Sequence, residues 1–214
     1  MAAKKKTKSR RSKPASAPKD PIARIVRAAL DEAAAVGWRQ VGMDAVARRA
    51  GMTLGDVLMH VPTKGHIVAR LADHIDMAMV KDAALPDRES SPRDRLFEIL
   101  MRRFDALQVH RDGIKALLKD AARDPGLAAM GLVRLSRSMA VALSAAGISA
   151  DGLIGCARVH GLKLVQVSAL RAWMNDDSDD MAKTMAALDK ALNLAERAAS
   201  MSKFRMKRPG RQAA

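Results

Sequence analysis

The stretch VARRAGMTLGDVLMHVPTK, residues 46–64, predicts two short helices and the turn between them. Gly51 ends the first, because glycine readily adopts the left-handed conformation with which many helices terminate. The hydroxyl of Thr53 can cap the second, with an acid three residues further on. Pro62 cannot continue that helix, since proline has no backbone N–H and clashes with the preceding turn. We therefore expect a helix over Met43–Ala50, a tight turn, and a helix of about two turns.

Helices are also expected on both sides of this stretch. Asp20 and Pro21 form the N-cap and first turn of a helix whose apolar residues recur every three or four positions until Gly37. Thr63 can cap a fourth helix. Three helices within residues 21–61, with a glycine turn between the second and third, match a helix-turn-helix. In that motif the third helix enters the DNA major groove and the second braces it.

The remainder of the chain predicts a helical body. Apolar residues at helical spacing indicate helices from Arg93, over Ile114–Ala122, from about Leu132 to Gly147, from Ser149 to Trp173, and over Ser178–Ser200. The helix that ends near Trp173 is apolar around most of its circumference, so we expect it at the centre or in a subunit contact. No run has the alternation of a strand. We expect an all-α fold of about nine helices, with a head and connecting helix over 20–82, a linker, and a body over 93–200.

The net charge of +15 is concentrated at the two ends of the chain. Residues 1–19 contain eight Lys or Arg and no acid, and residues 201–214 contain five and no acid, whereas residues 20–200 contain 25 basic and 23 acidic residues. Both ends are poor in apolar residues, so we expect disordered basic tails. Such tails attract phosphate backbones without sequence preference, and also anionic lipid headgroups. The charge alone leaves DNA, a membrane surface or nonspecific nucleic-acid binding open.

Three features predict a soluble, cytoplasmic protein. Residues 1–19 lack the apolar run that follows the charged part of a signal peptide, and the longest uncharged run, Ser138–Ala150, is too short to span a bilayer. The single cysteine, Cys156, cannot form an internal disulfide, which fits a reducing compartment. We expect it to be a small buried apolar residue rather than a nucleophile.

The segment RIVRAALDEAAAVGWRQVGMDAVARRAGMTLGDVLMHVPTKGHIV, residues 24–68, resembles the N-terminal head of TetR-family transcriptional regulators. The shared features are the I-x-x-A-A-L start, the Gly37 turn, the DAVARRAGMTLG core, and a Thr-Lys pair that follows a proline before the fourth helix. The resemblance covers roughly residues 21–70. It implies a homodimeric repressor that binds double-stranded DNA, with C-terminal helices that form the dimer contact and hold a hydrophobic small-molecule ligand.

The same resemblance assigns DNA-contacting roles by position. It implies recognition-helix residues at its start and end, backbone contacts from the second helix, and a lysine that binds phosphate at the start of the fourth helix. These residues are Thr53, Leu54, Gly55, Met59, His60, Met43, Asp44 and Lys64. The chain departs from the family pattern at Leu58 and Val61, where aromatic residues are usual. No Arg, Asn or Gln lies between Gly51 and Val61, so the bidentate base contacts of many readers have no candidate here.

A second resemblance concerns residues 162–192, LKLVQVSALRAWMNDDSDDMAKTMAALDKAL. They are similar to the C-terminal region of the lipid-binding accessory family of ubiquinone biosynthesis, which shares the TetR-like fold. The features are a Trp near a helix end, an Asp-Ser-Asp break, and a Thr and a Leu-Asp pair on the last helix. This alternative implies a non-enzymatic carrier with an isoprenoid or quinone pocket and a terminal amphipathic helix that contacts membrane. The mixed charges on that helix favour burial against a neighbour instead.

Both resemblances require an apolar cavity among the body helices. Large or flexible side chains are the candidate ligand-binding residues, and most such residues are ordinary core packing. The candidates are Met101, Phe104, Met130, Met139, His160 and Trp173.

Neither a metal site nor catalysis is expected. The five histidines include no H-E-x-x-H motif. The acids of NDDSDD, residues 175–180, lack the glycine and closing glutamate of a calcium loop, so we expect them to cap a helix. No G-x-S-x-G, P-loop or dinucleotide-binding turn is present. We therefore expect a binding protein without a cofactor rather than an enzyme.

Overall fold

The computed structural model describes residues 20–81 and 89–206, and these residues form nine α-helices, one short 3-10 helix and no strand. The predicted N-terminal tail lies outside the described residues. Three helices make up the head: α1 (Pro21–Val36), α2 (Met43–Ala50) and α3 (Leu54–His60), with the 3-10 helix η1 (Trp38–Gln40) after α1. Their predicted bounds are confirmed. Gly51 has φ of 63° between α2 and α3, which is the left-handed conformation inferred from the sequence.

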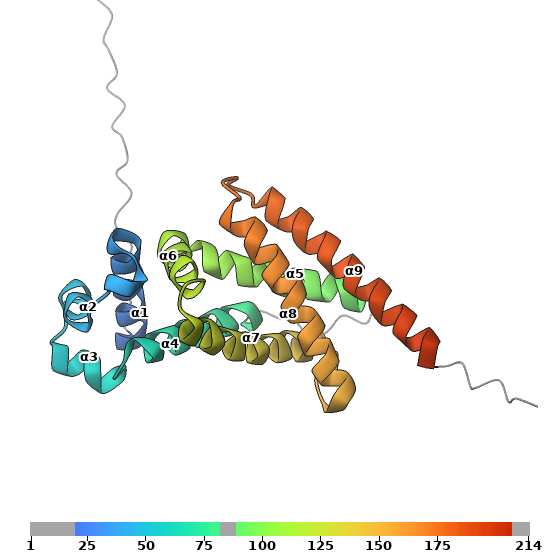
Figure 1. Ribbon diagram of the computed structural model, residues 1–214, viewed down its shortest axis with the longest axis horizontal. Helices are drawn as coiled ribbons and strands as arrows, with labels where there is room; N and C mark the ends of the chain where they lie inside the picture. Colours follow the sequence, from blue (N-terminus) through green and yellow to red (C-terminus); the bar gives the residue numbers. More distant parts are fainter. Residues whose placement is uncertain (1–19, 82–88, 207–214) are drawn as a thin grey trace, which may run out of the picture.

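α4 (Lys64–Val80) leads from the head into the body, as Figure 1 shows. The body contains α5 (Pro92–Gln108), α6 (Arg111–Ala121), α7 (Pro125–Ala145), α8 (Gly152–Met174) and α9 (Ala182–Met206). α9 packs along α8 on the side of the body farthest from the head (Figure 1). Buried residues from α1 through α9 form one continuous hydrophobic core. The expected all-α fold is therefore confirmed.

Three helices differ from the sequence-based expectation. α7 begins at Pro125, seven residues before the expected Leu132, because the Asp124 carboxylate caps it through the Leu127 N–H at 3.0 Å. Asp124 and Pro125 thus repeat the cap-and-proline start of α1. α9 continues to Met206, so the first six residues of the predicted C-terminal tail are helical. α8 was expected at the centre or in a subunit contact; Leu153 is 91% exposed, so the first turns of α8 are not central, and the subunit contact stays a prediction.

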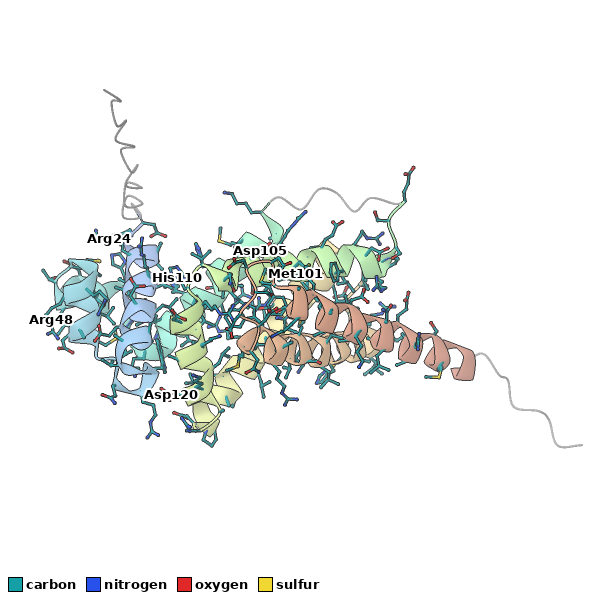
Figure 2. The ribbon with its side chains drawn as sticks, turned by 90° about the horizontal axis from the view of Figure 1, so that it is seen from above. Arg24, Arg48, Met101, Asp105, His110 and Asp120 are labelled. Atoms are coloured by element: carbon teal, nitrogen blue, oxygen red, sulfur yellow. The ribbon has the colours of Figure 1, made fainter. Side chains whose placement is uncertain are left out.

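The head and the body are in contact through α1 and α6. A Cβ atom on Gly113 of α6 would lie 2.3 Å from the Leu30 carbonyl oxygen of α1, so the two helices cross where only glycine fits. The backbone N–H of Arg39, in η1, donates to Oδ2 of Asp120 at 2.9 Å. Figure 2 shows Asp120 on α6, beside the head. The head is therefore held to the body by α6 as well as by α4.

α7 and α8 are long and apolar enough to cross a membrane, judged by length and composition alone, although core helices of soluble proteins meet the same criterion. Most of the apolar part of each helix is not buried within this single chain. Their exposed apolar side chains are Leu132, Val133, Leu153, Ile154 and Leu164. These two helices therefore present an apolar surface that residues 20–81 and 89–206 leave uncovered.

Candidate functional site

The recognition-helix candidate, α3, is held by its inward residues and presents the others to solvent. Val57 and Val61 are fully buried in the head core. Val61 stands where the TetR-like pattern usually has an aromatic residue, and here it is a packing residue. Of the outward residues, Leu54 is 43% exposed and Met59 is 86% exposed. An exposed methionine of this size on a two-turn helix is available for a contact outside the chain.

The start of α3 is fixed by a reciprocal cap. The Thr53 Oγ1 accepts the backbone N–H of Asp56 at 3.1 Å, and its hydroxyl donates to Oδ2 of Asp56 at 2.7 Å. The predicted cap is present. Thr53, Gly55 and His60 are exposed. The positions expected to contact DNA from α3 are thus accessible to solvent.

α2 contributes two of the predicted DNA contacts. Met43 is half-buried and packs against the core, whereas Asp44 is exposed and accepts a hydrogen bond from Nη1 of Arg48 at 2.8 Å. The bond from the Arg48 side chain, with backbone N–H groups and the Arg48 charge, lowers the pKa of Asp44. Arg24 of α1 donates to the Ala50 carbonyl oxygen at 2.5 Å, at the end of α2. Figure 2 labels Arg24 and Arg48 on the head.

Lys64, expected to bind a phosphate, is turned toward the head. Its Nζ donates to the carbonyl oxygens of Trp38 at 2.6 Å and Arg39 at 3.2 Å, and it lies 5.2 Å from the centre of the Trp38 ring. Burial lowers the pKa of Lys64, against the opposing effect of the Asp120 carboxylate. The carbonyl oxygens of η1 and the indole ring of Trp38 attract the ammonium. The sequence alone did not indicate either partner. Phosphate binding by Lys64 stays a prediction.

The head itself carries little net charge. Residues 20–64 contain six basic side chains, Arg24, Arg27, Arg39, Arg48, Arg49 and Lys64, against the five acids Asp20, Asp31, Glu32, Asp44 and Asp56. Several of the cations are paired with these acids. α3 contains no Lys or Arg. Electrostatic attraction to a phosphate backbone would therefore have to come mainly from outside the head, and the predicted basic N-terminal tail lies outside the described residues.

A cleft of about 390 Å³ lies between the head and the body. Its lining includes Trp38 and Arg39 from η1, Lys64 and Val68 from α4, and Leu127 and Met130 from α7. The lining of the cleft combines two cations and the Asp124 carboxylate with four apolar side chains. The cleft could not be inferred from the sequence, because its three contributing segments are brought together only by the packing of α6 against the head and of α7 against α4 and α6.

The six predicted ligand-binding residues do not meet in this cleft. Met130 alone lines it. Phe104, Met139 and Trp173 are fully buried in the core, Met101 is half-buried against it, and His160 is exposed on α8. Trp173 Nε1 donates to Oε1 of Gln108 at 2.9 Å, and the Arg111 guanidinium lies 5.3 Å from its ring centre. A role in ligand binding for these residues stays a prediction.

A buried polar cluster in the body was missed from the sequence. Arg103 Nη1 of α5 donates to Oδ1 of Asp76 in α4 at 2.7 Å, and the Ser138 hydroxyl of α7 donates to Oδ2 of the same carboxylate at 2.8 Å. Burial lowers the pKa of Arg103, against the effect of Asp76. The Arg103 Nε is buried without a hydrogen-bond partner among the described residues. The signal available was an Asp on the otherwise apolar inner side of α4.

The acidic NDDSDD segment acts as the expected helix cap. Asp176 is fully buried, and its carboxylate accepts the backbone N–H of Thr184 at 2.8 Å and its hydroxyl at 2.7 Å. Burial alone raises the pKa of Asp176, but the hydrogen bonds from Ser178 and Thr184 outweigh it and hold that pKa well below the usual range. Together with the buried Trp173 and Leu188, these residues account for the features behind the lipid-carrier resemblance by packing and capping.

Cys156 was expected to be buried, and this expectation is wrong. It is exposed on the surface of α8, where its Sγ lies 3.7 Å from Nδ1 of His160. The His160 Nδ1 also lies 2.9 Å from the Cys156 carbonyl oxygen. The sequence of α8 is mostly apolar, which is why Cys156 was expected to lie in the core. The described residues contain no group of three or more His, Cys, Asp or Glu that could hold a metal ion.

The chain is similar in structure to solved TetR-type proteins. A TetR transcriptional regulator from Nitrosomonas europaea matches with a TM-score of 0.69 and 22% identity, over 83% of this chain and 99% of that one. A TetR transcriptional regulator from Rhodococcus sp. RHA1 matches with a TM-score of 0.59 and 22% identity, over 84% and 97%. No protein-family model and no curated protein sequence matches the chain. The TetR-like fold expected from the head is therefore confirmed.

Proposed function

We propose that the chain is a transcriptional regulator that binds double-stranded DNA as a homodimer through α3 of each copy. The observation that carries the proposal is the exposed side of α3. Its N-terminus is capped by Thr53, its inner residues anchor it, and Met59 projects into solvent with 86% of its surface exposed. A helix of this length in a helix-turn-helix fits the DNA major groove, which is about 12 Å wide.

The lack of an arginine or lysine on α3 determines how such a head would read DNA. Single polar contacts from Thr53 and His60 and apolar contacts from Leu54 and Met59 to thymine methyl groups are the available interactions. Each contributes less than a bidentate pair, so affinity has to be supplemented by backbone attraction and by two heads that bind at once. The basic segment 1–19, directly before α1, would supply the backbone attraction.

The homodimer part of the proposal rests on α7 and α8. A monomeric soluble protein rarely leaves a large apolar surface open. Leu153, His160 and Leu164 follow one another at intervals of seven and four along α8, so they share one side of the helix. Leu153 and Leu164 are 91% and 73% exposed. A second copy of the chain that packs against this side would bury them and hold two heads at a fixed separation.

A selection experiment tests the DNA-binding proposal. The purified full-length chain is mixed with sheared genomic DNA of its source organism at about 0.15 M salt, where weak surface attraction is screened. Retained fragments are then sequenced. Wild type is expected to enrich a small set of fragments, and the Met59→Ala and His60→Ala variants are expected to lose that enrichment.

Met77→Ala is the matched control. Met77 is 70% exposed on α4, so this variant removes a similar exposed methionine away from α3. It is expected to enrich the same fragments as wild type. Retention that follows only fragment length, with no enriched sequence, contradicts the proposal.

The dimer is tested separately by light scattering, in which Leu153→Glu is expected to halve the mass observed for wild type.

A further inference from the structure

We propose that the cleft between head and body binds an amphiphilic monocarboxylate, and that this ligand controls the position of the head. The inference rests on the proposed function, since it names the ligand class and the place through which DNA binding would be regulated. The cleft differs from the predicted pocket within the body in both location and lining.

The volume and position of the cleft suit a regulatory site. About 390 Å³ falls within the range of small-molecule sites, roughly 300–1,000 Å³. Its lining comes from η1 in the head, the first turns of α4, and the start of α7 in the body. Any occupant therefore contacts the head, the connecting helix and the body at once.

The charges of the lining select the ligand class. Arg39 and Lys64 are its cations, and the acid among the lining residues, Asp124, already accepts the Leu127 N–H. Within the described residues, the Arg39 guanidinium makes no hydrogen bond or ion pair, and the bonds of this residue come from its backbone N–H and carbonyl oxygen. Lys64 uses two of its three N–H donors on the carbonyls of Trp38 and Arg39. A carboxylate can therefore accept a bidentate contact from Arg39 and a further one from Lys64.

The apolar residues of the lining indicate the chemistry of the uncharged part of the ligand. Trp38, Val68, Leu127 and Met130 give the cleft an apolar side, and the flexible thioether of Met130 can adjust to different chains or rings. One charged group and an apolar body match this lining, whereas a phosphate or sugar would leave the apolar side unused. The class is therefore a monocarboxylate with a short apolar body.

Binding would act on the head through the contacts that already join it to the body. The lysine that faces the cleft also holds η1, and the Arg39 N–H is bonded to Asp120 of α6. A ligand that binds one head position more tightly than another shifts the population toward the preferred one. Its effect on DNA affinity equals the ratio of its two affinities, commonly about 5–150-fold.

Calorimetry with the full-length chain tests the site without DNA. Octanoate is the probe, and octan-1-ol and octylammonium are its uncharged and oppositely charged controls. Octanoate is expected to bind at one site per chain, and neither control is expected to match it. Arg39→Gln is expected to weaken binding by roughly tenfold, the loss expected when one charge-assisted hydrogen bond is removed.

Gly65→Leu provides a steric test. A Cβ at Gly65 would lie 3.6 Å from Sδ of Met130, so the helix tolerates the substitution while the rest of the leucine enters the cleft. This variant is expected to lose octanoate binding. Gly131→Leu and Arg197→Gln are the matched controls, because a Cβ at Gly131 has no neighbour within 4 Å and Arg197 is exposed on α9. Both are expected to bind octanoate as wild type does.

Three results overturn the inference: no saturable octanoate binding, binding by Gly65→Leu equal to wild type, or equal affinity for octan-1-ol. Selective DNA retention without octanoate binding overturns the site and leaves the proposed function intact. Octanoate binding without selective DNA retention leaves the site and overturns the proposed function. If both occur but octanoate does not change retention of the enriched fragments, the site stands and its control of the head is overturned.

Discussion

Removal of one partner from the ion pair of Asp76 and Arg103 should strongly destabilise the body, and a double-variant cycle can measure the coupling between the two residues. The two side chains are only 14% and 9% exposed, so each charge depends on the other for compensation. Removal of one partner from a buried pair costs about 3–5 kcal/mol. We therefore expect Arg103→Met to lower the free energy of unfolding by that amount, since the Ser138 hydroxyl alone cannot neutralise the carboxylate. Asp76→Leu should cost a similar amount.

The double variant Asp76→Leu/Arg103→Met should be far more stable than either single variant. It removes both charges together, and it also removes the buried Arg103 Nε that lacks a partner. The hydroxyl of Ser138 then loses its acceptor, which costs on the order of 1 kcal/mol. The double variant should thus lie within about 1–2 kcal/mol of wild type, with a coupling energy of at least about 3 kcal/mol.

Urea unfolding followed by circular dichroism, at one fixed protein concentration, gives these free energies. Arg48→Met is the matched control, because the Arg48–Asp44 pair is 72% and 61% exposed, and it should unfold as wild type does. Single variants that each cost less than about 1 kcal/mol would refute the reasoning, since that is the range of solvated surface pairs. So would costs that simply add in the double variant.

Three further perturbations have defined outcomes. Gly113→Ala places a methyl group 2.3 Å from the Leu30 carbonyl oxygen and should lower the free energy of urea unfolding by about 1–3 kcal/mol, whereas Gly131→Ala should not. Because hydrogen bonds depress the folded-state pKa of Asp176, its carboxylate stabilises the fold above about pH 4. The deficit of Asp176→Ala in the urea midpoint should therefore be present at pH 7 and shrink as the pH falls below that value. Burial, with Arg27 and His74, lowers the pKa of His110 against the effect of Asp31, so stability should fall as the pH drops below about 6.5. His110→Gln should flatten this pH dependence, and an unchanged slope would contradict the assignment.

The head could be predicted from sequence because its signals are local. The Asp20–Pro21 start, Gly51 and the Thr53 cap each act within four residues, and the structure confirms each of them. The start of α7 was missed although Asp124 and Pro125 form the same local signal. The error came from reliance on apolar periodicity, which is weak in the first turns of α7, where most residues are exposed or half-buried.

The cleft and the buried polar cluster could not be predicted in the same way, because they depend on which helices become neighbours. Asp76 and Ser138 are 62 residues apart, and each is an ordinary polar residue in its own helix. Lys64, at the edge of the head, also has partners that are distant in sequence. Its position before the fourth helix was recognised, but its partners, the carbonyls of Trp38 and Arg39, lie 25–26 residues away. Through these contacts the Lys64 ammonium joins η1 to α4.

α4 carries a residue of each polar site, Lys64 at the cleft and Asp76 in the buried cluster of the body. Lys64 lies in its first turn and Asp76 lies 12 residues further on, a distance of about 18 Å along a helix. The first contact fixes α4 to the head and lines the cleft, while the second fixes α4 to α5 and α7 in the body. A ligand in the proposed cleft would thus act at the head end of α4, while the contacts of Asp76 with Arg103 and Ser138 and the core packing of α4 hold its body end.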